Sequence, residues 1–336
     1  SKAQEELLIW YGILVRCDTA DTQMLMVGNG IDDTPVLLPK HSGASTCSIP
    51  LCRSCLRGKG RRTSLQSSIG SPTVEHADVI KEGDLLPGDC VSTDQFECRT
   101  KGRLPSSRGK EDPHKMYCGG TVMIDHASGV IKIYHQLSLG ASDTVRSKEV
   151  HELWALEHGI NVKTYRGDNG VYKSALFKED LVQRQQTMTY SGVGAHGQNG
   201  VAERAIQTVV TSARTMMLHQ ALLWPEQFDM RLWPFALDQT AYLYNHLSNT
   251  SSGLAPLEIF TGSKLDTSTL RNEKVWGCPV YVLDQKLQDG KKVLKWSCCS
   301  CRAIYLGVSR LHSSAVHMVL NITTGKVSPQ KQKSEK

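Results

Sequence analysis

The chain has no long apolar run and no opening segment of the kind that directs a protein out of the cell. None of its apolar stretches approaches the roughly 18 residues that a membrane-spanning helix needs, and residues 1–6 lack the apolar region of a signal peptide. The apolar fraction of 40% is that of a globular protein. We therefore expect a nuclear or cytoplasmic protein with no membrane partner.

The sequence also lacks an internal repeat and a dense disulfide pattern. Its 11 cysteines are scattered over 336 residues, and an odd count in an intracellular chain indicates reduced thiols, some of them metal ligands. The two cysteine groups are Cys47, Cys52 and Cys55, and Cys298, Cys299 and Cys301. Cys52 and Cys55 have the Cys-x-x-Cys spacing of half a zinc site, but zinc needs four ligands. Neither His41, Cys17 nor Cys47 has a convincing spacing for the other half.

Net charge is only +6, so the position of the charges matters more than their sum. Basic residues gather in two runs: Arg53, Arg57, Lys59, Arg61 and Arg62, and then Arg99, Lys101, Arg103, Arg108, Lys110 and Lys115. A solvated surface would explain either run alone. Two runs beside near-neutral sequence indicate a polyanionic partner such as nucleic acid.

Periodicity divides the chain into three units and a tail. Residues 1–65 form an N-terminal unit, residues 63–80 a linker, residues 80–250 a core, residues 270–330 a small β-rich unit and residues 331–336 a tail. The core has strand patterns at 90–96, 120–125, 129–134, 160–165 and 187–190, and helix patterns at 142–158 and 173–185. The basic segment 98–116 is loop-like. Strands followed by alternating strands and helices predict an α/β fold with a mixed sheet flanked by helices.

The stretch from residue 196 to 204 is a turn that leads into a helix. Turn formers up to Gly200 give way to good helix formers, and Glu203 falls in the first helical turn. Apolar residues then recur at helical spacing: Ala202, Ile206, Val209, Ala213, Met216 and Met217. Taken alone, Glu203 is explained by the favourable interaction of an acid with the amide dipoles of a first turn.

Two further acids gain meaning from their context. Asp94 lies inside a strand, where aspartate is uncommon, and Asp168 follows a later strand within a good turn sequence, Gly-Asp-Asn-Gly. Carboxylates at the ends of different elements can converge, and like charges that converge persist when cations neutralise them. Asp89, Glu97 and Asp125 are competing acids that spacing alone does not exclude.

The contexts of these three acids resemble the D,D,E signature of the integrases of copia-type LTR retrotransposons. They read Val-Ser-Thr-Asp-Gln around Asp94, Arg-Gly-Asp-Asn-Gly around Asp168 and Gln-Asn-Gly-Val-Ala-Glu-Arg around Glu203. Further landmarks follow in the family's order: Cys52-Arg-Ser-Cys55, Tyr242-Leu-Tyr-Asn245, Pro256-Leu-Glu258, Gly277-Cys-Pro and Tyr305-Leu-Gly. The resemblance covers residues 10–330.

The resemblance implies a ribonuclease H-like core in which Asp94, Asp168 and Glu203 are both catalytic and ligands of Mg²⁺ or Mn²⁺. It implies processing of the 3′ ends of element DNA and their transfer into target DNA, by a homo-oligomer assembled on DNA. The expected DNA contacts are Gln198, Asn199, Arg204 and Gln207 at the helix start, and Arg57, Lys59, Arg61 and Arg62 on phosphates. A non-catalytic nucleic-acid-binding remnant and a nuclease of the same fold are the alternatives.

The chain departs from the family at its N-terminal unit. The family has a histidine after the position of Trp10 and a second one a few residues on, and these complete the zinc site. This chain has Tyr11 and Arg16 there. Cys52 and Cys55 are thus a residual half-site, and we expect no tightly bound zinc. Cys298, Cys299 and Cys301 also stand where basic or polar residues are expected.

Overall fold

The computed structural model describes residues 2–14, 23, 26, 40, 44, 52–59, 85–105, 108, 112–191, 199–248, 252–309, 312–313 and 316–331. Its centre is a five-stranded sheet in the order β3-β2-β1-β4-β5. The strands are β1 (Val91–Gly102), β2 (Tyr117–Asp125), β3 (Ile131–Gln136), β4 (Thr164–Gly167) and β5 (Thr187–Tyr190). The first three pair antiparallel, and β4 and β5 run parallel to β1. The predicted mixed sheet is confirmed.

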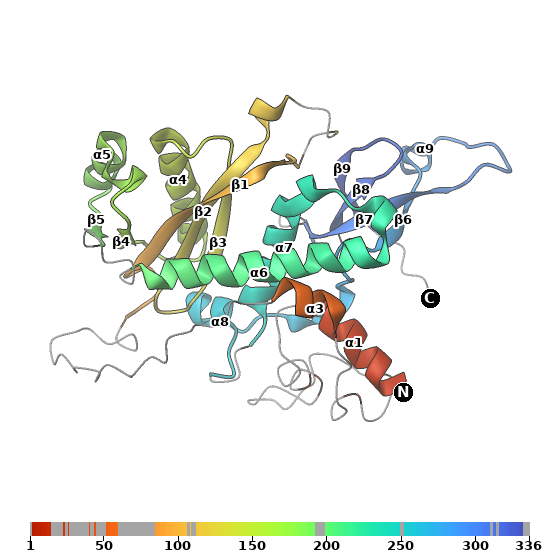
Figure 1. The fold of residues 1–336 in the computed structure, drawn as a ribbon, viewed down its shortest axis with the longest axis horizontal. Coiled ribbons are helices and arrows are strands. Elements are labelled where there is room, and N and C mark those ends of the chain that lie inside the picture. Colours follow the sequence, from red (N-terminus) through yellow and green to blue (C-terminus); the bar gives the residue numbers. More distant parts are fainter. Residues whose placement is uncertain are drawn as a thin grey trace.

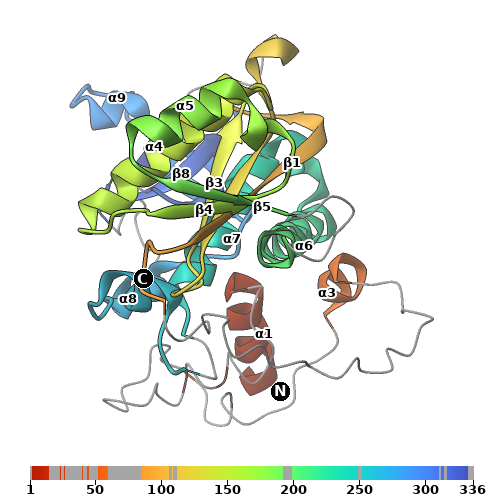
Figure 2. The same cartoon turned by 90° about the vertical axis from the view of Figure 1, so that its left-hand side faces the viewer.

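Helices cover both faces of this sheet (Figure 2). Helices α4 (Ala141–Glu157) and α5 (Ala175–Gln183) cover one face, and α6 (Gly200–Leu223) and α7 (Trp233–His246) cover the other. Each face has its own apolar core: Tyr165, Tyr172 and Phe177 on the α5 side, and Val122, Val209 and Met216 on the α6 side. The expected apolar stripe of α6 is buried except for Ile206, which is half-buried.

The N-terminal helices lie against α6, on the side away from the sheet (Figures 1 and 2). They are α1 (Lys2–Leu14) and α3 (Arg53–Gly58). Leu7 and Leu14 of α1 join the apolar core of α6 and α7. Gly58 lies so close to Thr215 of α6 that a Cβ atom there would be 2.3 Å from the threonine hydroxyl oxygen.

A second sheet follows α7, in the order β6-β7-β8-β9 and antiparallel throughout. Its strands are β6 (Pro279–Leu283), β7 (Ser300–Val308), β8 (Val316–Asn321) and β9 (Val327–Lys331), and two short helices, α8 (Pro256–Thr261) and α9 (Gln285–Gln288), lie between α7 and β7. Leu306, Leu320 and Val327 share a core cluster with α6 and α7. The division into units remains a prediction, but the described parts of all three units share this core.

Three local differences from the sequence expectations have physical causes. β1 continues to Gly102 because that residue still pairs with Tyr117, so Arg99 and Lys101 lie in a strand and not in a loop. The strand expected at 160–165 begins only at Thr164. β9 was not expected, because Pro329 interrupts its short pattern, but an edge strand tolerates proline.

The aromatic residues of the segment from residue 224 to 247 were expected in the core. Trp233 and Phe235 of α7 are buried as expected, whereas Trp224, Phe228, Tyr242 and Tyr244 are half-buried. Within the described part of the chain, no helix is both long enough and apolar enough to cross a membrane.

Candidate metal and nucleic-acid site

Asp94 lies on the central strand, facing Val122 of β2 in the register. Its side chain is half-buried, and Oδ1 accepts a hydrogen bond of 2.8 Å from the backbone N–H of Gln95. β1 is the central strand, and its backbone pairs with β2 at Asp94 and with β4 as far as Ser92. A rigid strand is a suitable support for a group that must keep its place.

Asp168 follows directly after β4, the parallel neighbour of β1. Ser92 pairs with Arg166, and continuing this register by two residues places Asp168 beside Asp94. The Asp168 side chain is exposed, and Oδ1 accepts a hydrogen bond of 3.0 Å from the N–H of Gly170. The aspartate therefore shapes its turn, as its sequence predicts, and still leaves its second carboxylate oxygen open.

Glu203 is exposed in the first turn of α6. Its N–H donates to the carbonyl oxygen of the N-cap residue Asn199, 3.1 Å away, which is the first helical bond. The Asn199 side chain donates to the carbonyl oxygen of Thr93, 3.3 Å away, on the residue before Asp94. The start of α6 is thereby fixed to the strand that carries Asp94.

Asp94 lies close enough to Asp168 and Glu203 for their charges to act on its carboxyl group. Burial is the main cause that raises the pKa of Asp94 to about 6, and the charges of Asp168 and Glu203 add to the rise. No group of three or more His, Cys, Asp or Glu side chains in the described part of the chain is arranged so that it could hold a metal ion. The acids are therefore near enough to repel one another but do not form a closed ligand shell.

Two of the three competing acids have structural partners. Asp125 is buried and accepts hydrogen bonds from Gly88 N–H and from both the N–H and the hydroxyl of Ser128. Asp89 forms an ion pair of 2.7 Å with Lys163. Glu97 is exposed on β1, three residues beyond Asp94. Among the causes of the pKa shift of Asp94, the only charged neighbours are Asp168 and Glu203.

Sequence reasoning missed two buried hydroxyl groups beneath the acids. The hydroxyls of Thr93 and Tyr172 lie 2.9 Å apart, and both side chains are almost fully buried. Thr93 directly precedes Asp94, and Tyr172 comes four residues after Asp168. The position of Thr93 and Tyr172 close in sequence to two candidate acids is the signal that could have identified them.

The expected DNA contacts fall into separate places. Arg204 and Gln207 are exposed on the first turns of α6, next to Glu203. Asn199 is only 5% exposed and its amide is bonded to Thr93, so the structure favours a turn-shaping role over the expected DNA contact. Gln198 lies outside the described residues.

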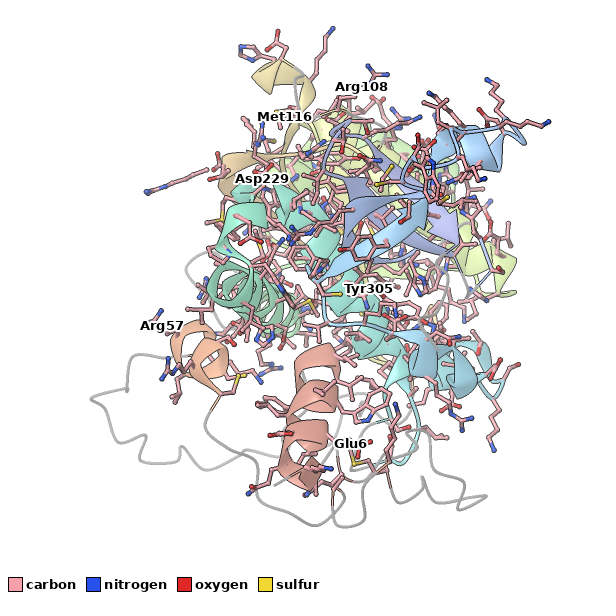
Figure 3. All side chains as sticks on the ribbon, turned by 90° about the vertical axis from the view of Figure 1, so that its right-hand side faces the viewer. Glu6, Arg57, Arg108, Met116, Asp229 and Tyr305 are labelled. Atoms are coloured by element: carbon pink, nitrogen blue, oxygen red, sulfur yellow. The ribbon has the colours of Figure 1, made fainter. Side chains whose placement is uncertain are left out.

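Of the four basic residues expected to contact DNA phosphates, Arg57 and Lys59 are described, and Arg61 and Arg62 lie outside the described residues. Arg57 projects outward from α3 (Figure 3). α3 packs at Thr215, which is 12 residues along α6 from Glu203. At about 1.5 Å per residue, this is a separation of roughly 18 Å along the helix. These basic residues therefore do not belong to the acid cluster.

Cys52 is the N-cap residue of α3, and Cys55 lies within that helix. Cys52 Sγ lies 3.4 Å from Ser54 Oγ, which lies 3.0 Å from Nδ1 of His219 in α6. Burial raises the pKa of Cys55 to about 11, although a hydrogen bond with Tyr11 opposes this rise. Cys17, His41 and Cys47 lie outside the described residues, so the expected absence of zinc stays a prediction.

The mixed five-stranded sheet with helices on both faces is a core of the ribonuclease H-like class, as the motifs predict. No family model matches the chain. The chain is 28% identical over 256 residues to a retrovirus-related Pol polyprotein from transposon TNT 1-94 of Nicotiana tabacum. This alignment covers 74% of the chain but only 17% of the relative. The similarity confirms the resemblance to the Pol polyproteins of copia-type retrotransposons.

Solved structures with a similar core include two viral integrases. The catalytic core domain of HTLV-2 integrase, in complex with magnesium, matches with 19% identity over 52% of this chain and 98% of that chain, with a TM-score of 0.37. The intasome of simian T-cell lymphotropic virus, in complex with a PP2A regulatory subunit, matches with 17% identity over 74% of this chain and 78% of that chain, with a TM-score of 0.40. Because both TM-scores are below 0.5, the fold assignment rests on the sheet topology.

Proposed function

We propose that the chain is a metal-dependent polynucleotidyl transferase of the D,D,E integrase type, acting on DNA. The observation that carries the proposal is that three acids from three elements, Asp94, Asp168 and Glu203, lie close enough for the charges of the last two to act on the first. Burial and repulsion disfavour the charged form of Asp94, so bound cations would relieve both. Carboxylate oxygens are the donors that Mg²⁺ and Mn²⁺ prefer, so the donor set fits these ions.

Two ions held by these three carboxylates would supply activation of an attacking oxygen and stabilisation of a leaving oxygen in phosphoryl transfer. The chain's own residues provide the support. β1 and the turn after β4 hold Asp94 and Asp168 side by side, and the start of α6 presents Glu203. The exposed Arg204 and Gln207 would hold DNA phosphates and sugars near these acids.

The proposed reactions are two displacements at phosphorus, a hydrolysis followed by a transesterification. In the first, water attacks the phosphodiester near a 3′ end of element DNA and the terminal nucleotides leave. In the second, the new 3′-hydroxyl attacks a phosphodiester of target DNA, and the oxygen of the broken target strand leaves. Because both reactions need the same in-line geometry, one set of acids can serve both.

DNA and a second copy of the chain are the proposed partners. Arg57 and Lys59 on α3 would add phosphate contacts whose strength falls with salt. Val150, Leu153 and Leu156 are exposed by 46%, 62% and 55% on the outer face of α4. An apolar helix face of this kind favours assembly into homo-oligomers on DNA.

The test is a joining assay with Mg²⁺. Duplex oligonucleotides with a recessed 3′ end and a pool of terminal sequences are offered with a supercoiled plasmid, so that the preferred end need not be known. We expect joined products from the wild type and none from Asp168→Asn or Glu203→Gln. The control Glu179→Gln changes an exposed acid on α5 and should leave joining unchanged. Joining by Asp168→Asn would overturn the catalytic assignment.

A second candidate is a non-catalytic nucleic-acid-binding remnant. It is favoured by the absence of a closed metal-ligand group among the described residues. It predicts salt-dependent DNA binding by the wild type without cleavage or joining. A nuclease of the same fold would cleave the plasmid with Mg²⁺ and never join an oligonucleotide to it, so the same assay separates all three.

A further inference from the structure

Thr93 is hydrogen-bonded to both of the other segments that carry candidate acids. Its hydroxyl lies 2.9 Å from the hydroxyl of Tyr172, and its carbonyl oxygen accepts the 3.3 Å hydrogen bond from Asn199 Nδ2. Thr93 itself is fully buried on β1, directly before Asp94. We propose that Thr93 is a positioning residue that joins the three acid-bearing segments to one another before a metal ion binds. This inference rests on the proposed metal-dependent function.

The bond to Tyr172 anchors the segment of Asp168. Tyr172 lies in a short 3-10 helix, Val171–Lys173, that ends the turn begun by Asp168. Its carbonyl oxygen accepts a hydrogen bond of 3.1 Å from the hydroxyl of Tyr190 at the end of β5. The turn after β4 is therefore attached to β1 on one side and to β5 on the other.

Gly167 provides the room for this attachment. A Cβ atom at Gly167 would lie 3.1 Å from Tyr172 Cδ2 and 3.3 Å from Thr93 Cγ2, and 2.9 Å from the terminal carbon of Met188. These contacts are tighter than side chains normally allow. The last residue of β4 is thus enclosed by the Thr93–Tyr172 pair, directly before Asp168.

The bond from Asn199 anchors the segment of Glu203. Asn199 is the N-cap of α6, and its own carbonyl oxygen accepts the first helical bond from Glu203 N–H. A shift of Asn199 would therefore carry Glu203 with it. Since Thr93 accepts from Asn199 through its backbone, this bond depends on the asparagine side chain and not on the identity of residue 93.

The bonds of Thr93 are needed because the backbone pairing between β1 and β4 ends before it reaches Asp94 and Asp168. The register between β1 and β4 includes only Val91 with Tyr165 and Ser92 with Arg166. Beyond it, Asp94 and Asp168 carry like charges that push their segments apart. The Thr93 bonds continue the link between these segments past the last backbone pair and hold the carboxylates near their working positions.

The experiment measures Mn²⁺ binding by titration calorimetry on DNA-free protein, together with the joining rate at several Mg²⁺ concentrations. Tyr172→Phe and Thr93→Val each remove one hydroxyl with little change of shape. We expect each to weaken Mn²⁺ binding about five- to tenfold, the effect of losing one ordinary hydrogen bond. The double variant should be no weaker than either single one, because both remove the same bond. Raised Mg²⁺ should restore most of the joining rate, with DNA affinity unchanged.

The matched control is Tyr165→Phe. Tyr165 is also buried in the sheet, but its hydroxyl donates to Glu152 on the α4 side, 2.9 Å away. This control should lose stability and keep its Mn²⁺ affinity. Equal Mn²⁺ affinity in wild type, Tyr172→Phe and Thr93→Val would overturn the proposal for Thr93 even if the wild type joins DNA. A wild type that binds Mn²⁺ but never joins DNA would sink the proposed function alone, and a wild type that binds no Mn²⁺ would sink both.

Discussion

Two clusters of carboxylates lie beside the same central sheet, and their charges have opposite kinds of neighbours. The acid site consists of Asp94, Asp168 and Glu203. The ion network between α4 and α5 consists of Lys148, Glu152, Asp180 and Arg184, with Lys148 Nζ 2.7 Å from Glu152 and 2.5 Å from Asp180. Arg184 lies 2.9 Å from Glu152 and 3.0 Å from Asp180.

The pKa directions show the consequence. Burial would raise the pKa of Asp180, but hydrogen bonds from Lys148 and Arg184 outweigh it and hold this pKa below its usual value. Burial also raises the pKa of Asp94, and there the neighbouring charges are two further acids, which push in the same direction. Among the described residues, Lys148 and Arg184 form ion pairs with the carboxylates between α4 and α5, whereas Asp94, Asp168 and Glu203 form none.

The ion network offers the largest effect. Lys148 is fully buried, and Lys148→Met would leave Glu152 and Asp180 with only the half-exposed Arg184 as a counter-charge. Removing one partner of a buried ion pair typically costs about 3–5 kcal/mol. We expect a loss of this size in the free energy of unfolding by urea, with Lys178→Met, an exposed lysine of α5, as the control. A loss equal to that of the control would show that the network contributes little.

The three acids could be singled out from local sequence, whereas the ion network could not, and the reason is physical. Asp94, Asp168 and Glu203 each lie in a local motif, and the strands and the helix that carry them have clear periodic patterns. The ion pair of Lys148 with Asp180 spans 32 residues, and the contact of Thr93 with Tyr172 spans 79. Nothing in either local segment marks the partner, because such contacts exist only after the elements have packed.

Arg103 illustrates the same limit. The basic run around it was expected to form a solvated, loop-like surface, but the side chain is only 4% exposed and donates to the carbonyl oxygen of Gly325. This bond joins the end of β1 to the turn before β9, over 222 residues of sequence. The two basic runs suggested a polyanionic partner, whereas this arginine of the second run is buried and takes part in packing.

A third carboxylate lies between the two extremes, since its partners are neutral donors. Glu273 accepts hydrogen bonds of 2.6 Å from Gln239 of α7 and from the hydroxyl of Tyr305 of β7, which is labelled in Figure 3. Burial raises its pKa to about 7, although these two donors oppose the rise. The folded state therefore binds this proton more tightly than the unfolded state, whose pKa is near 4.5.

We expect the contribution of Glu273 to the free energy of unfolding to fall as pH rises. Between about pH 4.5 and pH 7 the folded state carries the Glu273 proton and the unfolded state does not, so the contribution of this proton is lost through that window and is absent above it. A shift of this size corresponds to about 3 kcal/mol. Urea unfolding at pH 5 and pH 8 should show a smaller pH dependence in Glu273→Gln than in the wild type. Identical pH dependence in both would exclude this role, and Glu179→Gln serves as the exposed control.

The sharpest test of the comparison uses the same substitution in both clusters. Asp94→Asn keeps the acceptor for Gln95 N–H and removes a charge that burial and two other acids disfavour. We expect it to stabilise the metal-free protein at pH 7.5 by roughly 1–2 kcal/mol, after allowing for solvent screening of these partly exposed groups. Asp180→Asn removes a charge that Lys148 and Arg184 stabilise, so it should destabilise the protein.

Added Mg²⁺ should then reduce the difference in the free energy of unfolding between Asp94→Asn and the wild type. An ion that binds only the folded wild type at ten times its dissociation constant adds about 1.4 kcal/mol to the free energy of unfolding, and Asp94→Asn should gain less because one ligand is weakened. Thermal unfolding of both variants in EDTA and in Mg²⁺ measures this directly. If Asp94→Asn lowered the melting temperature in EDTA, as Asp180→Asn is expected to do, the protein itself would stabilise the charge of Asp94, and the contrast between the two clusters would be wrong.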